Sequence, residues 1–127
     1  MKKTTIKSAI ILFSFLAFIA CSNDNNEETQ EVIFAGEWSG TFSGGDSGTW
    51  EIAVNNFGNV SGNVFSNNLQ DFLIVEGTVD TSGEFRATAG SAENGATFTG
   101  SFTENSSSGT WENTAANISG TWQGTRN

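Results

Sequence analysis

The chain has 127 residues, a formal net charge of −9 at pH 7, one cysteine and no histidine. One thiol cannot form an internal disulfide, and without histidine there is no imidazole base to activate a serine or cysteine nucleophile. The acidic balance excludes the basic surface that a nucleic-acid-binding protein needs. This length and a hydrophobic content of 36% fit one small folded domain rather than a disordered chain.

The first 20 residues have the layout of a secretory signal peptide. Lys2, Lys3 and Lys7 give a positive start, and an uncharged, mostly apolar run follows over residues 8–20. That run is short for a transmembrane helix, which needs about 20 apolar residues. We therefore expect residues 1–20 to be removed during secretion.

The apolar run ends in Phe18-Ile19-Ala20-Cys21, which resembles the lipobox of bacterial lipoproteins. Phe18 stands where leucine is usual. The resemblance implies that Cys21 becomes the mature N-terminus and carries acyl chains such as palmitate. Each buried methylene contributes about 0.8 kcal/mol, so several chains would hold the protein stably in a membrane. A free thiol in an apolar segment is the alternative.

Residues 21–33 are expected to form a flexible linker, because the stretch after Cys21 is polar, acidic and nearly free of apolar groups. Asp24, Glu27 and Glu28 resemble the acidic run that directs Bacteroidota-type lipoproteins to the outer face of the outer membrane, and a plain spacer is the alternative. Loss of the three leader lysines changes the formal charge from −9 to −12. Such a charge repels anionic headgroups and favours a domain held away from the bilayer.

From residue 34 to residue 127 a short pattern recurs: a glycine, one further residue and then a large apolar side chain, as in Gly36-Glu37-Trp38. Clusters rich in Gly, Asn, Asp and Ser separate the copies. Strands at such regular spacing are typical of an all-β sandwich or barrel. The expected strands cover residues 36–43, 48–55, 58–65, 71–80, 83–89, 95–103, 108–113 and 118–126.

Apolar and polar residues alternate along these strands, so each strand has one dry face and one wet face. Eleven of the 15 glycines fall on the dry face. Inward glycines let strands bend as a sheet closes, and aromatic neighbours cover the gaps. We therefore predict an up-and-down antiparallel meander of eight strands that forms a small closed or nearly closed barrel. A β-sandwich, which needs fewer such glycines, is the alternative.

The interior of such a barrel is either filled by its own side chains or holds one small ligand. Here the inward positions carry four tryptophans, several phenylalanines and a set of aliphatic side chains. A filled core is the main expectation. A small apolar pocket at one mouth is the alternative.

Gly36-Glu37-Trp38, at the start of the first strand, resembles the G-x-W motif of the lipocalin and avidin-like barrels, the calycins. In these families a basic residue near the end of the last strand packs across that tryptophan. Arg126 has the matching inward parity, whereas the T-D-Y motif of lipocalins is missing. The resemblance implies that Trp38 and Arg126 close the barrel. A cation over an aromatic face contributes about 0.5–2 kcal/mol.

We expect no catalysis, no cofactor and no metal site. Within strands the glutamates fall on the wet face, where carboxylates stay solvated and do not converge in a cleft as hydrolytic pairs must. Oxygen-rich turns around Asp46 and at residues 80–84 leave a calcium site as the alternative to ordinary turn chemistry. The glutamates that fall on the wet faces of the strands are Glu37, Glu51, Glu76, Glu84 and Glu112.

One apolar cluster breaks the alternation. Phe65, Phe72 and Ile74 fall on the wet face of two consecutive strands, and Leu69 lies in the turn between them. Contiguous exposed apolar groups often mark a contact site. We predict a binding site here, and a loop folded over the barrel mouth is the alternative.

Together these features predict a lipid-anchored lipoprotein of the cell envelope, in the outer membrane and exposed at the surface if the acidic run acts as an address. Its barrel would be a non-catalytic surface-interaction or binding module. The expected partners are the membrane, through the anchor, and either a protein or a small apolar ligand, with no nucleic acid. The alternative function is a lipocalin-like carrier of a small apolar molecule.

The anchor has a direct test. Mass spectrometry of the mature protein extracted from membranes should show Cys21 as the N-terminal residue with acyl chains attached, because the lipobox directs both cleavage and acylation. A mature mass without acyl chains would contradict it.

Overall fold

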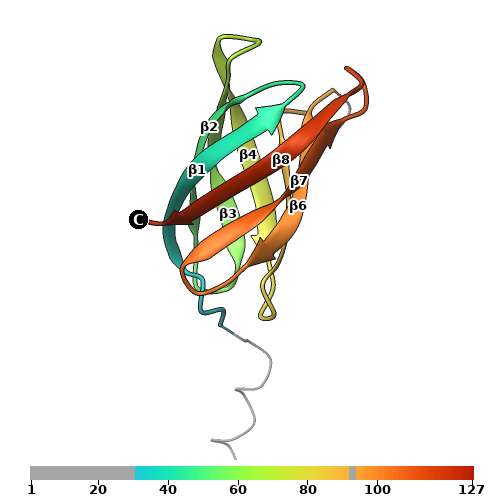
Figure 1. The fold of residues 1–127 in the computed structure, drawn as a ribbon. Coiled ribbons are helices and arrows are strands. Elements are labelled where there is room, and N and C mark those ends of the chain that lie inside the picture. Colours follow the sequence, from blue (N-terminus) through green and yellow to red (C-terminus); the bar gives the residue numbers. More distant parts are fainter. Residues whose placement is uncertain (1–30, 92–93) are drawn as a thin grey trace, which may run out of the picture. The chain divides into compact units, whose positions relative to one another are not determined.

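Eight antiparallel strands follow one another around a closed barrel in the computed structural model, which describes residues 31–91 and 94–127. The predicted signal peptide, Cys21 and most of the predicted linker lie outside these residues. Each strand pairs with its two neighbours in sequence, and β8 returns to pair with β1 (Figure 1). The strands are β1 (Gly36–Gly44), β2 (Gly48–Val54), β3 (Asn59–Ser66), β4 (Asp71–Val79), β5 (Glu84–Ala89), β6 (Ala96–Phe102), β7 (Ser106–Asn113) and β8 (Ile118–Arg126).

This architecture confirms the predicted meander and barrel, and the β-sandwich alternative is wrong. The predicted strand limits agree with the structure to within one residue, except that β7 begins at Ser106 instead of residue 108. A tight turn brings it forward, because the amide of Thr103 donates to the carbonyl oxygen of Ser106 at 2.8 Å. In the part of the chain that the structure describes, no helix has the length and apolar character needed to cross a membrane.

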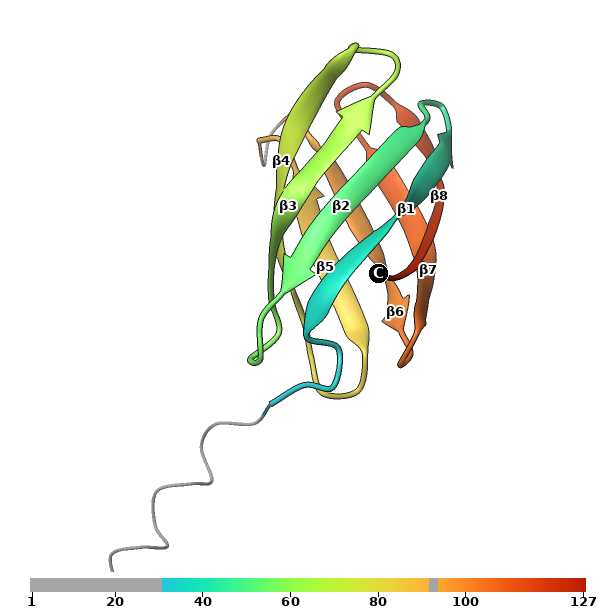
Figure 2. The same ribbon diagram turned by 90° about the vertical axis from the view of Figure 1, so that its left-hand side faces the viewer.

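The seam between β1 and β8 completes the barrel. Its register runs from Trp38 opposite Arg126 to Gly44 opposite Gly120. Strands at the two ends of the domain sequence thus lie side by side, as the two views of the ribbon show (Figure 2). Closure leaves no edge strand along this seam for another chain to pair with.

All four tryptophans are buried in the barrel. Each indole N–H donates to a backbone carbonyl, which satisfies the polar group of an otherwise apolar side chain. The distances are 2.9 Å from Trp38 to Phe34, 3.3 Å from Trp50 to Thr41, 3.1 Å from Trp111 to Ser43, and 3.0 and 3.1 Å from Trp122 to Thr99 and Thr110.

Three of these indoles lie against glycines of neighbouring strands. A methyl group added at Gly40 would come within 2.6 Å of the Trp50 ring, and one at Gly120 within 2.7 Å of the Trp111 nitrogen. A methyl group added at Gly100 would come within 2.7 Å of the Trp122 ring. The inward glycines therefore leave the space that the tryptophans fill.

Gly124→Ala tests this packing. An added methyl would overlap the Trp50 ring and approach the carbonyl oxygen of Ser39 to 2.5 Å, so the substitution should lower the free energy of unfolding by about 3 kcal/mol. Urea denaturation followed by tryptophan fluorescence measures it. Thr125→Ala, on the exposed outer face beside it, should change stability by less than about 0.5 kcal/mol. Equal losses in the two variants would contradict the assignment.

Candidate functional site

The two ends of the barrel differ. One end carries the start of β1, the end of β8 and the turns at residues 55–58, 80–83 and 103–105. We call it the sealed end. The opposite end carries the turns at residues 45–47, 67–70 and 114–117, together with residues 90–91 and 94–95, and we call it the mouth.

Residues before β1 fill the sealed end. Val32 and Phe34 are buried, and the amide of Val32 donates to the carbonyl oxygen of Asn56 at 2.9 Å. The Phe34 ring packs edge-on against Phe102 with centroids 6.0 Å apart. The linker was predicted to extend through residue 33, whereas Val32 packs in the core because its side chain is one of the few apolar groups able to cover this end. The compact unit accordingly spans Glu31–Asn127.

We call residues 32–34 the plug. Arg126 holds the plug in place. Its guanidinium carbon lies 4.8 Å from the centroid of the Trp38 ring, and Trp38 has no exposed surface. The same guanidinium donates to the carbonyl oxygens of Ala35 and Ile33, at 2.5 and 2.9 Å, and to that of Glu104 at 2.8 and 3.0 Å. One cation thus joins the segment before β1, the β6–β7 turn and the end of β8.

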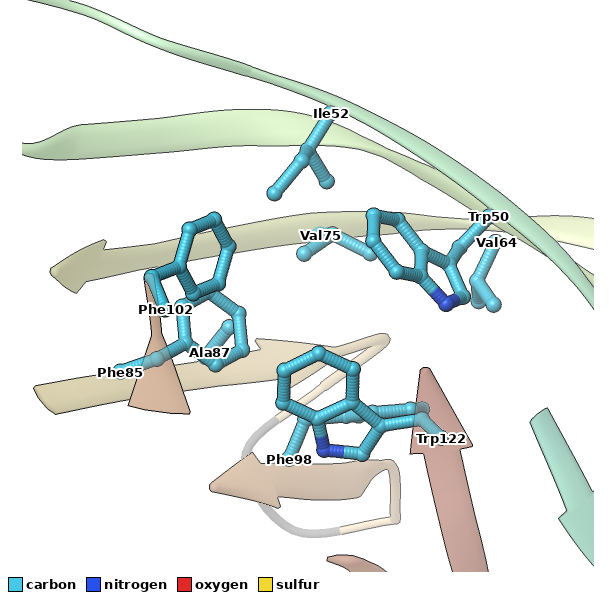
Figure 3. Close-up of a pocket in the computed structure, with 9 residues that line it drawn as sticks. All are labelled: Trp50, Ile52, Val64, Val75, Phe85, Ala87, Phe98, Phe102 and Trp122. Atoms are coloured by element: carbon cyan, nitrogen blue, oxygen red, sulfur yellow. The ribbon is translucent and has the colours of Figure 1, made fainter. Parts of the chain in front are cut away.

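Side chains fill the middle of the barrel. Only a void of about 20 Å³ remains there, enough for about one water molecule. Indole and phenyl rings converge on this void from several strands (Figure 3). Its lining consists of Trp50, Ile52, Val64, Val75, Phe85, Ala87, Phe98, Phe102 and Trp122.

The mouth, in contrast, holds a cavity of about 320 Å³. Its walls are mainly apolar and come from every strand except β2 and from the turns at this end, whereas its rim is polar. The apolar lining includes Phe42, Leu73, Phe98, Trp111 and Ile118, and the polar rim includes Asp46, Asn68, Ser91, Asn94 and Asn113. A concave apolar pocket with a few polar groups is the usual form of a small-molecule site, and such sites measure about 300–1,000 Å³.

Asp46 holds the rim together. Its carboxylate accepts hydrogen bonds from the amide of Ser47 at 2.6 Å, the amide of Asn68 at 3.0 Å and the hydroxyl of Ser66 at 2.6 Å. These bonds connect the β1–β2 turn to the β3–β4 turn. The carboxylate is therefore already occupied by donors of the chain itself.

In the second candidate for a calcium site, the turn at residues 80–84, the aspartate carboxylate likewise accepts hydrogen bonds from the chain itself. Asp80 Oδ1 accepts from the hydroxyl and amide of Ser82 and from the amide of Glu84, at 2.7, 3.0 and 2.9 Å. The Ser82 hydroxyl and then the Glu84 amide hold the pKa of Asp80 below its usual value. No group of three or more acidic, cysteine or histidine side chains suited to a metal occurs among residues 31–91 and 94–127. Both aspartates make the side-chain hydrogen bonds to nearby amides and hydroxyls that are typical of turns.

The predicted apolar cluster divides into two parts. Leu69, 61% exposed, lines the mouth. Phe72 and Ile74 are 62% and 65% exposed on the outer face of β4, and the half-buried Phe65 ring packs against Phe72 with centroids 5.0 Å apart. We call Phe65, Phe72 and Ile74 the hairpin patch.

The sequence did not point to most residues of the mouth. Asn94, Asn113 and Ile118 belong to turns or strand ends far apart in the chain, and only closure of the barrel brings them together. The predicted meander order did indicate which turns meet at the mouth, since every second turn of a meander lies at the same end. The apolar triplet at residues 32–34 interrupts the polar composition of the predicted linker, but only the structure shows that it packs into the sealed end.

Comparison with known proteins gives no family assignment: no family model matches the chain. No curated protein sequence matches it either.

Replacing Arg126 tests the sealed end. Arg126→Met should lower the free energy of unfolding by about 2–3 kcal/mol, because it removes a cation–π contact and several charge-assisted hydrogen bonds. Urea denaturation measures the loss. Arg86→Met is the matched control, because Arg86 is exposed on the outer face of β5, and it should change stability by less than about 0.5 kcal/mol. A similar effect of both variants would show that Arg126 does not fasten the plug.

Proposed function

We propose that this protein is a lipid-anchored lipoprotein of the cell envelope whose calycin-like barrel is a non-catalytic binding module. Its ligand would be a small apolar or amphiphilic molecule held at the mouth. The observation that carries this proposal is the 320 Å³ cavity with apolar walls at one end of a barrel whose other end is plugged.

The position of the cavity argues for a ligand bound at the mouth rather than one enclosed within the barrel. The void in the middle is about 20 Å³, too small for an organic molecule. Phe98 lines both the void and the mouth cavity, so aromatic side chains form the floor on which a ligand would lie. Burial of its apolar surface there would contribute about 25 cal/mol per Å².

Charge restricts the class of ligand. The chain carries a formal net charge of −9, and Asp46 lies on the rim. An anionic head group would be repelled there. We therefore propose a ligand with an apolar body and a neutral or cationic polar end, for which the amide groups of Asn68, Asn94 and Asn113 supply donors and acceptors.

The anchor and the location remain part of the proposal. A lipidated Cys21 would attach the chain to the membrane through a linker that joins the barrel at its sealed end, since residues 32–34 lie there. The mouth is at the other end of the barrel, so ligand access would not depend on removal of the linker. The acidic residues after Cys21 support an outer-membrane, surface-exposed location.

A second candidate function is contact with a partner protein. The specific observation in its favour is the hairpin patch, whose Phe72 and Ile74 are 62% and 65% exposed.

Dye binding tests the mouth. Nile red, a neutral apolar dye, should bind the full chain saturably with one site and a blue shift of its emission, because the cavity is apolar. Ala116→Trp places an indole at the exposed rim of the cavity and should weaken binding about tenfold. Ala53→Trp, the same substitution on the exposed outer face of β2, should not. Absence of saturable binding, or equal effects of both variants, would overturn the proposed site.

A further inference from the structure

The β3–β4 hairpin extends beyond β5, the strand beside β4. β3 pairs with β4 up to Ser66 opposite Asp71. On its other side, however, β4 pairs with β5 only from Val75 to Val79, so residues 71–74 continue past the end of that ladder. Both ribbon views show the hairpin as the farthest-reaching turn of the mouth (Figures 1 and 2). The hairpin patch lies on this projecting part.

The patch is a continuous apolar surface. Phe65 stands directly opposite Phe72 in the ladder, and the two rings pack edge to face at 5.0 Å. Ile74 follows Phe72 on the same face of β4. None of these side chains belongs to the buried core, so packing of the barrel does not require them to be apolar. Exposed contiguous groups of this kind mark contact surfaces.

Carboxylates border the patch. Glu51 stands opposite Asn63, which stands opposite Ile74, and Glu76 follows Ile74 on the same face of β4. Both glutamates are exposed. The whole chain is acidic, with a formal charge of −9. The surface therefore combines apolar groups with a negative border.

We expect a partner to contact this surface through side chains rather than by adding a strand. The amide of Phe72 already donates to the Asp71 carboxylate at 2.8 Å, and this bond occupies a group that an added strand would need.

We infer that the hairpin patch is a docking surface for a basic, apolar polypeptide segment, one that alternates aromatic or aliphatic side chains with lysine or arginine. Apolar side chains of the partner would cover Phe72 and Ile74, and its cations would lie near Glu51, Glu76 and the Phe72 ring. A second copy of this chain carries the same negative charge and is repelled, as are anionic lipids and nucleic acids. The inference rests on the proposal that the barrel is a binding module, but it uses a surface separate from the mouth cavity.

Three synthetic octapeptides with a fluorescent label test the inference on the full chain by fluorescence anisotropy. The first peptide alternates lysine with phenylalanine, the second alternates lysine with serine, and the third alternates glutamate with phenylalanine. The lysine–phenylalanine peptide should bind at least about tenfold more tightly than the other two, because only it offers both charge and apolar surface. Equal binding of the lysine–serine peptide would overturn the inference, since attraction to the net charge would then suffice.

Variants locate the contact. Phe72→Ser combined with Ile74→Ser should weaken the lysine–phenylalanine peptide about tenfold. Phe57→Ser is the matched control, because Phe57 is 56% exposed in a turn at the sealed end, and it should leave the affinity unchanged. Glu51→Gln combined with Glu76→Gln keeps the apolar groups and should weaken binding about threefold while reducing its salt dependence. This pair of variants decides the charge argument even if the serine variant unfolds.

Two further outcomes distinguish failure here from failure of the mouth site. Loss of peptide binding in Ala116→Trp, with no loss in the Phe72 and Ile74 variant, would assign the peptide to the mouth and overturn the inference. Self-association of the full chain in sedimentation experiments, abolished by the Phe72 and Ile74 substitutions, would make the patch an interface between copies and overturn it as well. Intact peptide binding in the absence of any Nile red site would support the patch alone.

Discussion

The packing of indole rings onto glycines is the constraint on which the barrel depends. Trp50 occupies space beside Gly40 and Gly124, where any side chain would overlap its ring. A glycine in a strand costs about 0.5–1 kcal/mol relative to alanine, but here it lets a large apolar side chain cross to the neighbouring strand and satisfy its N–H on a backbone carbonyl. The filled centre follows from this arrangement, since the large rings occupy the space left by the missing side chains.

The same packing explains why the two ends have different properties. Aromatic rings fill the centre, so a ligand can only occupy an end, and the segment containing Val32 and Phe34 already covers one of them. Arg126 fastens that segment through its backbone carbonyls and lies over Trp38. At the mouth, Asp46 performs a comparable task for two turns without covering the cavity. The asymmetry of the barrel therefore comes from the segment before β1, which covers one end only and is fastened there by Arg126.

The outer surface adds a separate property. Ser, Thr and charged residues cover most of the wet face, as the alternation requires of a barrel in water. Phe72 and Ile74 depart from that alternation on a hairpin that projects past β5. Because the amide of Phe72 already donates to the Asp71 carboxylate, contact with other molecules at this surface would rely on side chains. The mouth and the hairpin patch are thus two distinct candidate sites on one rigid scaffold.

The sequence by itself determined the eight strands, their inward and outward faces and their meander order, because side-chain alternation and turn composition are local properties. It also marked Phe72 and Ile74 as exposed and paired Trp38 with Arg126 through a family resemblance. Tertiary structure decided that Val32 packs in the core, that the centre is full and that the mouth is open. These outcomes depend on how rings from different strands share a fixed volume and on which distant turns meet at one end, and no local pattern encodes either.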